Sequence, residues 1–128
     1  MDRRTFLHTA LLSATAVGIA PMAAFAAPTG RFEGRSRHTT SGGVTVEQGN
    51  GGTLIRLHDD FKLDSGPDPI VGLGKDGKWD PATYSGDLAN LNGGQDYTVP
   101  SGVDAAAYNE VYIWCRAADV PLGVASLK

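Results

Sequence analysis

The 128-residue chain contains a single cysteine, Cys115, which therefore has no partner for an internal disulfide bond. Cysteines in an oxidising compartment are more often paired. Cys115 is thus expected to be a buried thiol, a reactive thiol, a ligand or one half of an intermolecular bridge. The chain also lacks a Cys-x-x-Cys-His segment, the motif that attaches haem covalently.

An excess of positive charge is absent as well. The chain has 11 Lys and Arg against 14 Asp and Glu, a net charge of −3, and its charges are scattered. Nucleic-acid-binding proteins usually show a basic patch, so this composition gives that function no support. No Gly-x-Ser-x-Gly segment, metal-binding His pair or nucleophile–base pair appears. An enzyme is therefore the least supported class of function.

The first 26 residues are expected to be an export signal. The string Arg3-Arg4-Thr5-Phe6-Leu7 resembles the twin-arginine transport motif, which implies export in the folded state. The mildly apolar stretch 9–20 that follows is too short to span a bilayer, which takes about 20 strongly apolar residues. The motif residues Arg3, Arg4, Phe6 and Leu7 thus predict a periplasmic or secreted protein.

The end of this signal is expected between Ala26 and Ala27, after the small residues Ala24 and Ala26 that a signal peptidase reads. No cysteine lies near this point, so a lipid anchor is not expected. The mature chain would have no membrane span. We expect a leader over residues 27–36 and one folded domain over residues 37–128.

The mature part is expected to be all-β, a single antiparallel β-sandwich of short strands. Its glycines lie in short clusters between apolar runs, as in folds with many tight turns. Residues 43–48 alternate between apolar and polar side chains, and residues 53–58 follow after Asn50-Gly51. This pattern predicts a β-hairpin.

The side chains of this region and of the next segment are expected to alternate between core and solvent. The apolar residues in one phase should face the core: Ile55, Leu57, Phe61 and Leu63. The other phase should place Arg56 and His58 toward solvent. Further strands are expected over 70–73, around Leu88–Leu91, and over 95–99, 110–116 and 120–127, with a long loop at 75–86 and a helical turn capped by Asp104.

The strand at 110–116 also predicts where the cysteine lies. Alternation puts Val111, Ile113 and Cys115 on one face and Tyr112 and Trp114 on the other. The Val/Ile face is the expected core, so Cys115 should be buried or half-buried. A buried cysteine often acts as a small hydrophobic residue, whereas a reactive thiol needs access and nearby positive charge.

Three groups of residues have the composition of known binding sites, but each departs from the spacing or the context that such a site requires. Residues 72–77 match the glycine fingerprint of dinucleotide-binding folds, but Pro81 follows and no apolar helical face does, which indicates a coincidence. The aspartates at positions 59, 60, 64 and 68 fit no calcium-loop spacing. Cys115, His38 and His58 are the residue types of a copper electron-transfer site, but the tight Cys-then-His spacing is missing.

Five segments of the chain stand out together: His38-Thr39-Thr40-Ser41-Gly42, Leu57 to Phe61, Gly66-Pro67-Asp68, Gly94-Gln95-Asp96-Tyr97-Thr98-Val99-Pro100 and Val111-Tyr112-Ile113-Trp114-Cys115. In this order and spacing they resemble the DM-thirteen domain, known from Skeletor-type animal surface proteins and bacterial secreted proteins. The resemblance covers residues 31–128. It implies an extracytoplasmic β-sandwich module for electron transfer. It also implies that Cys115 acts as a redox thiol or as ligand to a prosthetic group such as haem.

Two functions therefore stay open. The first is an exported redox or electron-transfer module centred on Cys115, with His38, His58 and Trp114 as secondary candidates and a redox or surface protein as partner. Haem, a metal or no cofactor at all are each compatible with this function. The second is a binding or adhesion module in which Cys115 belongs only to the core, with Tyr112 and Trp114 available for docking.

The N-terminal motif generates one prediction. Mass spectrometry of the exported protein should find a chain that begins at Ala27, and the double substitution Arg3→Lys, Arg4→Lys should keep the chain in the cytoplasm with Met1 attached. The matched pair Arg35→Lys, Arg37→Lys makes the same change outside the motif and should not affect export. An exported chain that still carries Met1 would contradict the prediction.

Overall fold

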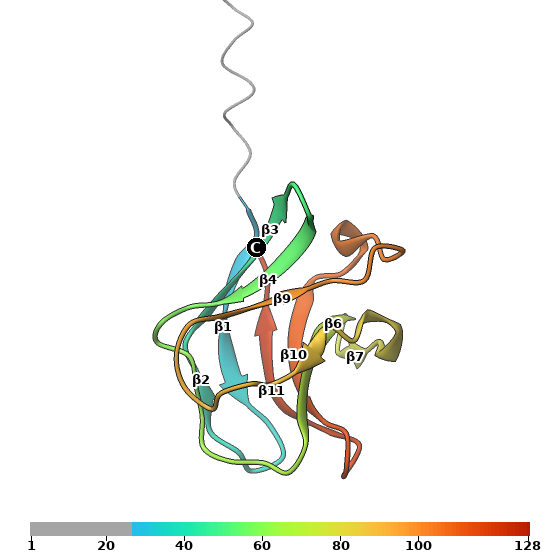
Figure 1. Cartoon of the computed structure of the whole chain (residues 1–128). Coiled ribbons are helices and arrows are strands. Elements are labelled where there is room, and N and C mark those ends of the chain that lie inside the picture. Colours follow the sequence, from blue (N-terminus) through green and yellow to red (C-terminus); the bar gives the residue numbers. More distant parts are fainter. Residues whose placement is uncertain (1–26) are drawn as a thin grey trace, which may run out of the picture.

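A computed structural model describes residues 27–128 of the chain (Figure 1). The predicted transport motif with Arg3, Arg4, Phe6 and Leu7, and the residue Ala26 before the predicted cleavage site, lie outside the described residues. Among the described residues, no helix is long and apolar enough to cross a membrane.

The described chain consists of short strands with two single-turn 3₁₀ helices. The elements in chain order are β1 (Thr29–Gly34), β2 (Thr40–Ser41), β3 (Gly43–Gly49), β4 (Gly52–Leu57), β5 (Lys62–Leu63), β6 (Pro69–Lys75), β7 (Lys78–Trp79), η4 (Pro81–Thr83), β8 (Gly86–Asp87), β9 (Gln95–Thr98), η5 (Ala105–Ala107), β10 (Glu110–Cys115) and β11 (Val120–Ser126).

Most strands belong to one antiparallel sheet in the order β7-β6-β10-β11-β1-β3-β4-β9, with β8 also paired to β6. Strands β2 and β5 form a separate small pair. Strand β1 joins the two halves of the large sheet: Thr29 pairs with Thr45 of β3, while Gly34 pairs with Gly123 of β11. The sheet therefore curls, and β3, β4 and β9 lie across from β6 and β10 (Figure 1). The predicted all-β, sandwich-like fold is confirmed, and its two layers are one continuous sheet.

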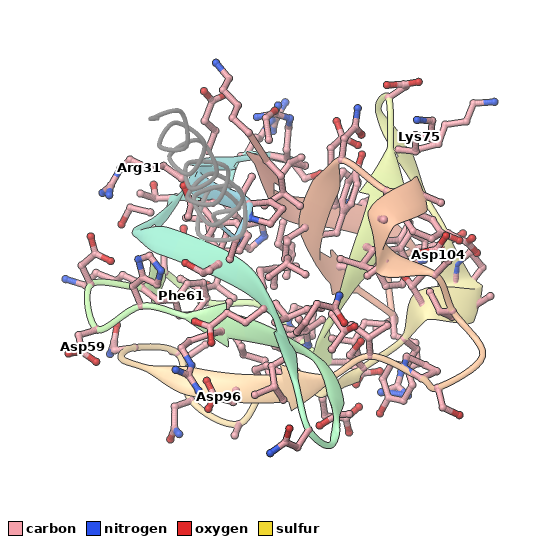
Figure 2. All side chains as sticks on the ribbon, turned by 90° about the horizontal axis from the view of Figure 1, so that it is seen from above. Arg31, Asp59, Phe61, Lys75, Asp96 and Asp104 are labelled. Atoms are coloured by element: carbon pink, nitrogen blue, oxygen red, sulfur yellow. The ribbon has the colours of Figure 1, made fainter. Side chains whose placement is uncertain are left out.

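The core fills the space between the two halves of the sheet. Figure 2 shows the labelled polar residues at its outer edges, with Arg31, Asp59 and Asp96 on one side and Lys75 and Asp104 on the other. The buried residues include the four that alternation assigned to the core: Ile55, Leu57, Phe61 and Leu63. From the opposite half come Val71, Leu73, Val111, Ile113, Cys115, Leu122 and Ala125.

The predicted hairpin at Asn50-Gly51 is confirmed, because β3 and β4 pair up to Gly49 and Gly52 on either side of this turn. A second hairpin was missed. The stretch 75–86, expected as a loop, contains β7, which pairs with β6 across Asp76 and Gly77. Both turn residues have positive φ, 50° and 87°, as a type I′ turn requires. The prediction of a loop over 75–86 was therefore wrong. The dipeptide Asp76-Gly77 is itself a strong signal for this turn and hence for a hairpin.

Residues 29–34, expected to be part of a leader, form β1 at the centre of the sheet. Only Phe32 is a large apolar residue there, so the sequence carries little strand signal. Phe32 is buried and meets Phe61 edge-to-face at 5.4 Å between ring centroids. Residues Leu88–Leu91 form no strand, and β8 lies just before them. The helical turn capped by Asp104 is confirmed as η5, because its carboxylate accepts from the Ala106 N–H.

The glycines of residues 72–77 lie in a strand and its turn and lead into strand β7 rather than into a helix, so this segment is not a dinucleotide site. They leave space for aromatic rings. A β-carbon added at Gly72 would lie 2.7 Å from the Trp79 ring, and one at Gly74 would touch the Tyr112 ring and lie 2.5 Å from the Lys78 carbonyl oxygen. Glycine at these positions lets the rings pack directly on β6.

Gly74→Ala is therefore expected to destabilise the domain by about 1–3 kcal/mol, the usual effect of overpacking. Urea unfolding measures the change. The control Gly49→Ala places its β-carbon no closer than 3.5 Å to any neighbour and should leave stability nearly unchanged. Equal effects of the two substitutions would show that space over β6 is not the reason for Gly74.

Candidate functional site around Cys115

Cys115 is the last residue of β10 and is 1% exposed, as alternation along this strand predicted. It pairs with Pro69 of β6 and with Val120 of β11. The Sγ–H donates to the Pro67 carbonyl oxygen at 3.0 Å, and the Ala118 N–H donates to Sγ at 3.4 Å. Both hydrogen-bond partners of the thiol are backbone groups.

Residues 65–68 form the loop that lies over the thiol, here called the covering loop. Arg116 holds one end of it: its N–H donates to the Asp68 carbonyl oxygen at 3.1 Å, and its Nε lies 3.2 Å from Asp68 Oδ2. The same guanidinium contacts Asp87 at 2.6 Å and lies over the Tyr84 ring, 5.5 Å from its centroid. The positive charge next to Cys115 in sequence is thus used to fasten the loop.

Asp64 holds the other end of the covering loop. Its carboxylate accepts from the backbone N–H of Thr39 at 3.0 Å and of Ser65 at 2.6 Å. It also lies 2.9 Å from His38 Nδ1. The hydrogen bond from Thr39, followed by that from His38, holds the pKa of Asp64 below its usual value of 3.8. His38 is therefore a half-buried partner of Asp64 beside the loop.

The other candidate histidine, His58, directly follows β4 in the opposite half of the sheet. Its Nε2 is 2.6 Å from Thr45 Oγ1, and its ring packs over Gly43. Its side chain is half-buried and faces a shallow hollow with Asp59 and Asp96. Among residues 27–128, no three His, Cys, Asp or Glu side chains come together as a metal site. The structure thus does not assemble Cys115, His38 and His58 into one ligand set.

The packing around Cys115 does not fit a haem or a metal ion. The sulfur is 1% exposed, both of its hydrogen-bond partners are backbone groups, and its neighbours on the same strand face are the core residues Val111 and Ile113. A prosthetic group needs room beside its ligand and further donor atoms, and this packing offers neither.

Two further acidic residues, Asp60 and Asp68, hold parts of the chain in place. Asp60 accepts from the Gly43 N–H at 2.9 Å and pairs with Arg31, and Asp68 pairs with Arg116. The hydrogen bond from Gly43 is the largest cause that lowers the pKa of Asp60. These carboxylates therefore bind parts of the chain itself.

The opposite face of β10 carries Tyr112 and Trp114, as alternation predicted, and a third aromatic residue, Trp79, packs against them from β7. Trp114 stacks on Trp79 of β7 with 5.2 Å between ring centroids and 7° between ring planes. Tyr112 meets both rings edge-on, at 6.0 Å and 6.1 Å. Trp79 was missed because its segment was expected to be a loop, and the Asp-Gly turn before it would have revealed a strand.

The burial of Tyr112 explains its acid–base state. Desolvation, assisted by the negative charge of Glu110, raises the pKa of its hydroxyl from 10 to about 12. The ring is 3% exposed, while Trp79 and Trp114 are half-buried. The two indoles therefore form the accessible part of this aromatic surface.

Comparisons with known proteins agree with the resemblance seen in the sequence. No curated protein and no solved structure matches this chain. The family model described as electron transfer DM13 matches residues 31–127, from strand β1 to the residue after β11. The match includes Cys115 and its covering loop, and it spans nearly all of the described domain. The chain therefore belongs to the electron transfer DM13 family.

Proposed function

We propose that this protein is an exported electron-transfer module in which the Cys115 thiol is the redox group. The observation that carries the proposal is the family match over residues 31–127 together with the place of the only cysteine inside that match. Both methionines, Met1 and Met22, precede the described domain, so Cys115 supplies the sole sulfur of residues 27–128. Export rests on the resemblance of the segment around Arg3 and Arg4 to a twin-arginine signal.

Burial of the thiol is compatible with this role, because an electron needs no open channel to leave a protein interior. The thiol proton limits the reaction, because it has to leave the protein interior together with the electron. To lose an electron at neutral pH, the thiol gives its proton to solvent and the electron to an acceptor protein, which leaves a sulfur-centred radical. The Sγ–H donates to the Pro67 carbonyl oxygen, so this hydrogen bond must break before the proton can leave.

The covering loop therefore controls the reaction in this proposal. Its residues Ser65, Pro67 and Asp68 are exposed, so the thiol lies only one loop below the surface. Movement of Pro67 away from Sγ removes the group that holds the proton and admits water to accept it. The fastening by Asp64 and Arg116 sets how often this happens.

A binding module is the second candidate, and the packing of Cys115 favours it. The side chain belongs to the core cluster with Val111 and Ile113, where a cysteine acts as a small hydrophobic residue. In that case the aromatic face of β10 would carry the function instead.

Voltammetry of the purified protein distinguishes the two functions. An electron-transfer module should give a redox couple that Cys115→Ser abolishes. The control Ala125→Ser introduces a buried hydroxyl on neighbouring β11 and should keep the couple, although each substitution is expected to lower stability by about 1–3 kcal/mol. If the wild-type protein shows no couple, or if Cys115→Ser keeps it, Cys115 is only part of the core.

The role of the covering loop gives a pH-dependent prediction. Because the pKa of Asp64 is lowered in the folded state, its ionised carboxylate stabilises the fold above pH 3.8, and this contribution disappears as the pH falls through the lower folded pKa. Asp64→Asn should therefore be less stable than wild type at pH 6, and the difference should shrink at pH 3. Thermal unfolding at the two pH values measures this.

The same variant should also react severalfold faster than wild type with a thiol reagent at pH 7, because the covering loop opens more often. Asp59→Asn, at an exposed carboxylate away from the loop, is the control and should change neither property. An unchanged thiol reaction in Asp64→Asn would contradict control by the covering loop.

A further inference from the structure

The outer face of β6, β7 and β10 carries a surface that the redox proposal does not use. We call Trp79, Tyr112 and Trp114 the aromatic platform. The two tryptophans are the only ones in the chain, and they stack on each other here. Trp114 points away from the core on β10, on the opposite face from Cys115, and Trp79 stacks on it from β7.

The platform is held rigidly. Gly72 and Gly74 let the rings of Trp79 and Tyr112 lie directly on the backbone of β6. The Trp114 Nε1–H donates to Asp119 Oδ1 at 3.2 Å, which fixes the indole in its plane. A preorganised aromatic surface loses little conformational entropy when a ligand binds to it.

Two hollows lie beside the stacked indoles, and Trp79, Trp114 and Asp119 line both of them. The larger has a volume of about 560 Å³, within the usual range for small-molecule sites. Its other charged lining residues are Arg35, Lys78 and Glu110. The smaller, of about 270 Å³, includes Tyr84 and Arg116.

The charged groups of the larger hollow are not equally available to a ligand. Glu110 accepts from the Gly77 N–H at 2.9 Å, and Asp119 accepts from Trp114. Lys78 is exposed and forms no ion pair within residues 27–128. Arg35 donates to the Gly34 carbonyl oxygen and lies 3.5 Å from Glu33, so some of its donors stay unused. Within residues 27–128, Lys78 is thus the charged group of this hollow without an ion pair, and Arg35 keeps spare donors beside it, while Glu110 and Asp119 each keep further acceptor sites.

We propose that the larger hollow binds a planar aromatic group that carries a negative charge. The ring would stack on the indoles, which favour offset or edge-on contact with another ring. The anionic group would pair with Lys78 and Arg35. This site does not depend on the redox role of Cys115, and Cys115→Ser should bind the same ligand with unchanged affinity.

Riboflavin 5′-phosphate and riboflavin test the proposal, because they share one planar ring system and only the first carries a phosphate. Equilibrium dialysis at low salt should show binding of both flavins, with the phosphate form bound about 2–5-fold more tightly, the size expected of an exposed ion pair. High salt should remove this preference. Quenching of tryptophan fluorescence reports contact directly, since both tryptophans belong to the platform.

Variants assign the two parts of the site. Lys78→Gln should lose most of the preference for the phosphate form, whereas Lys75→Gln, at the register partner of Lys78 outside the hollow, should keep it. Trp79→Leu should weaken the binding of both flavins, and circular dichroism verifies that this variant is folded. Failure of the wild-type protein to bind either flavin, or equal binding of both at low salt, would overturn the proposal. Tighter binding of a cationic dye would instead assign the hollow to Glu110 and Asp119.

Discussion

The pairing of β1 with two different strands is the constraint on which the rest of the structure depends. Its first residues pair with β3 and its last with β11, so one continuous sheet turns back over itself. A flat sheet of these short strands would leave one apolar face open to water, whereas the curled sheet buries both inner faces against each other. Phe32, the one large apolar residue of β1, lies at the join and packs on Phe61.

Strand β10, which β11 separates from β1, carries both candidate sites back to back. Its inner face supplies Val111 and Ile113 to the core and ends at Cys115, while its outer face presents Tyr112 and Trp114. Period-two alternation keeps the two chemistries apart, because neighbouring side chains point to opposite sides of the sheet. A redox thiol and an aromatic binding surface are therefore compatible in one small domain.

The covering loop shows how charges can act on a buried thiol without touching it. Arg116 and Asp64 hold the two ends of residues 65–68 in place. Between them, the Pro67 carbonyl oxygen accepts a hydrogen bond from the Cys115 thiol. Exposed ion pairs contribute little to overall stability. Here their position matters more than their energy, because they hold a short segment that separates the sulfur from water.

The sequence by itself determined which side chains of a strand point into the core. The burial of Ile55, Leu57 and Cys115 and the hairpin at Asn50-Gly51 followed from alternation and turn chemistry, which depend only on neighbouring residues. The same reasoning could have found β7 through Asp76-Gly77, but not β1, whose strand forms because partners far along the chain pair with it. The tertiary structure alone decided which side chains meet. It brought Trp79 to Trp114 across β6 and put His58 in the other half of the sheet from Cys115, because such contacts depend on strand order and register.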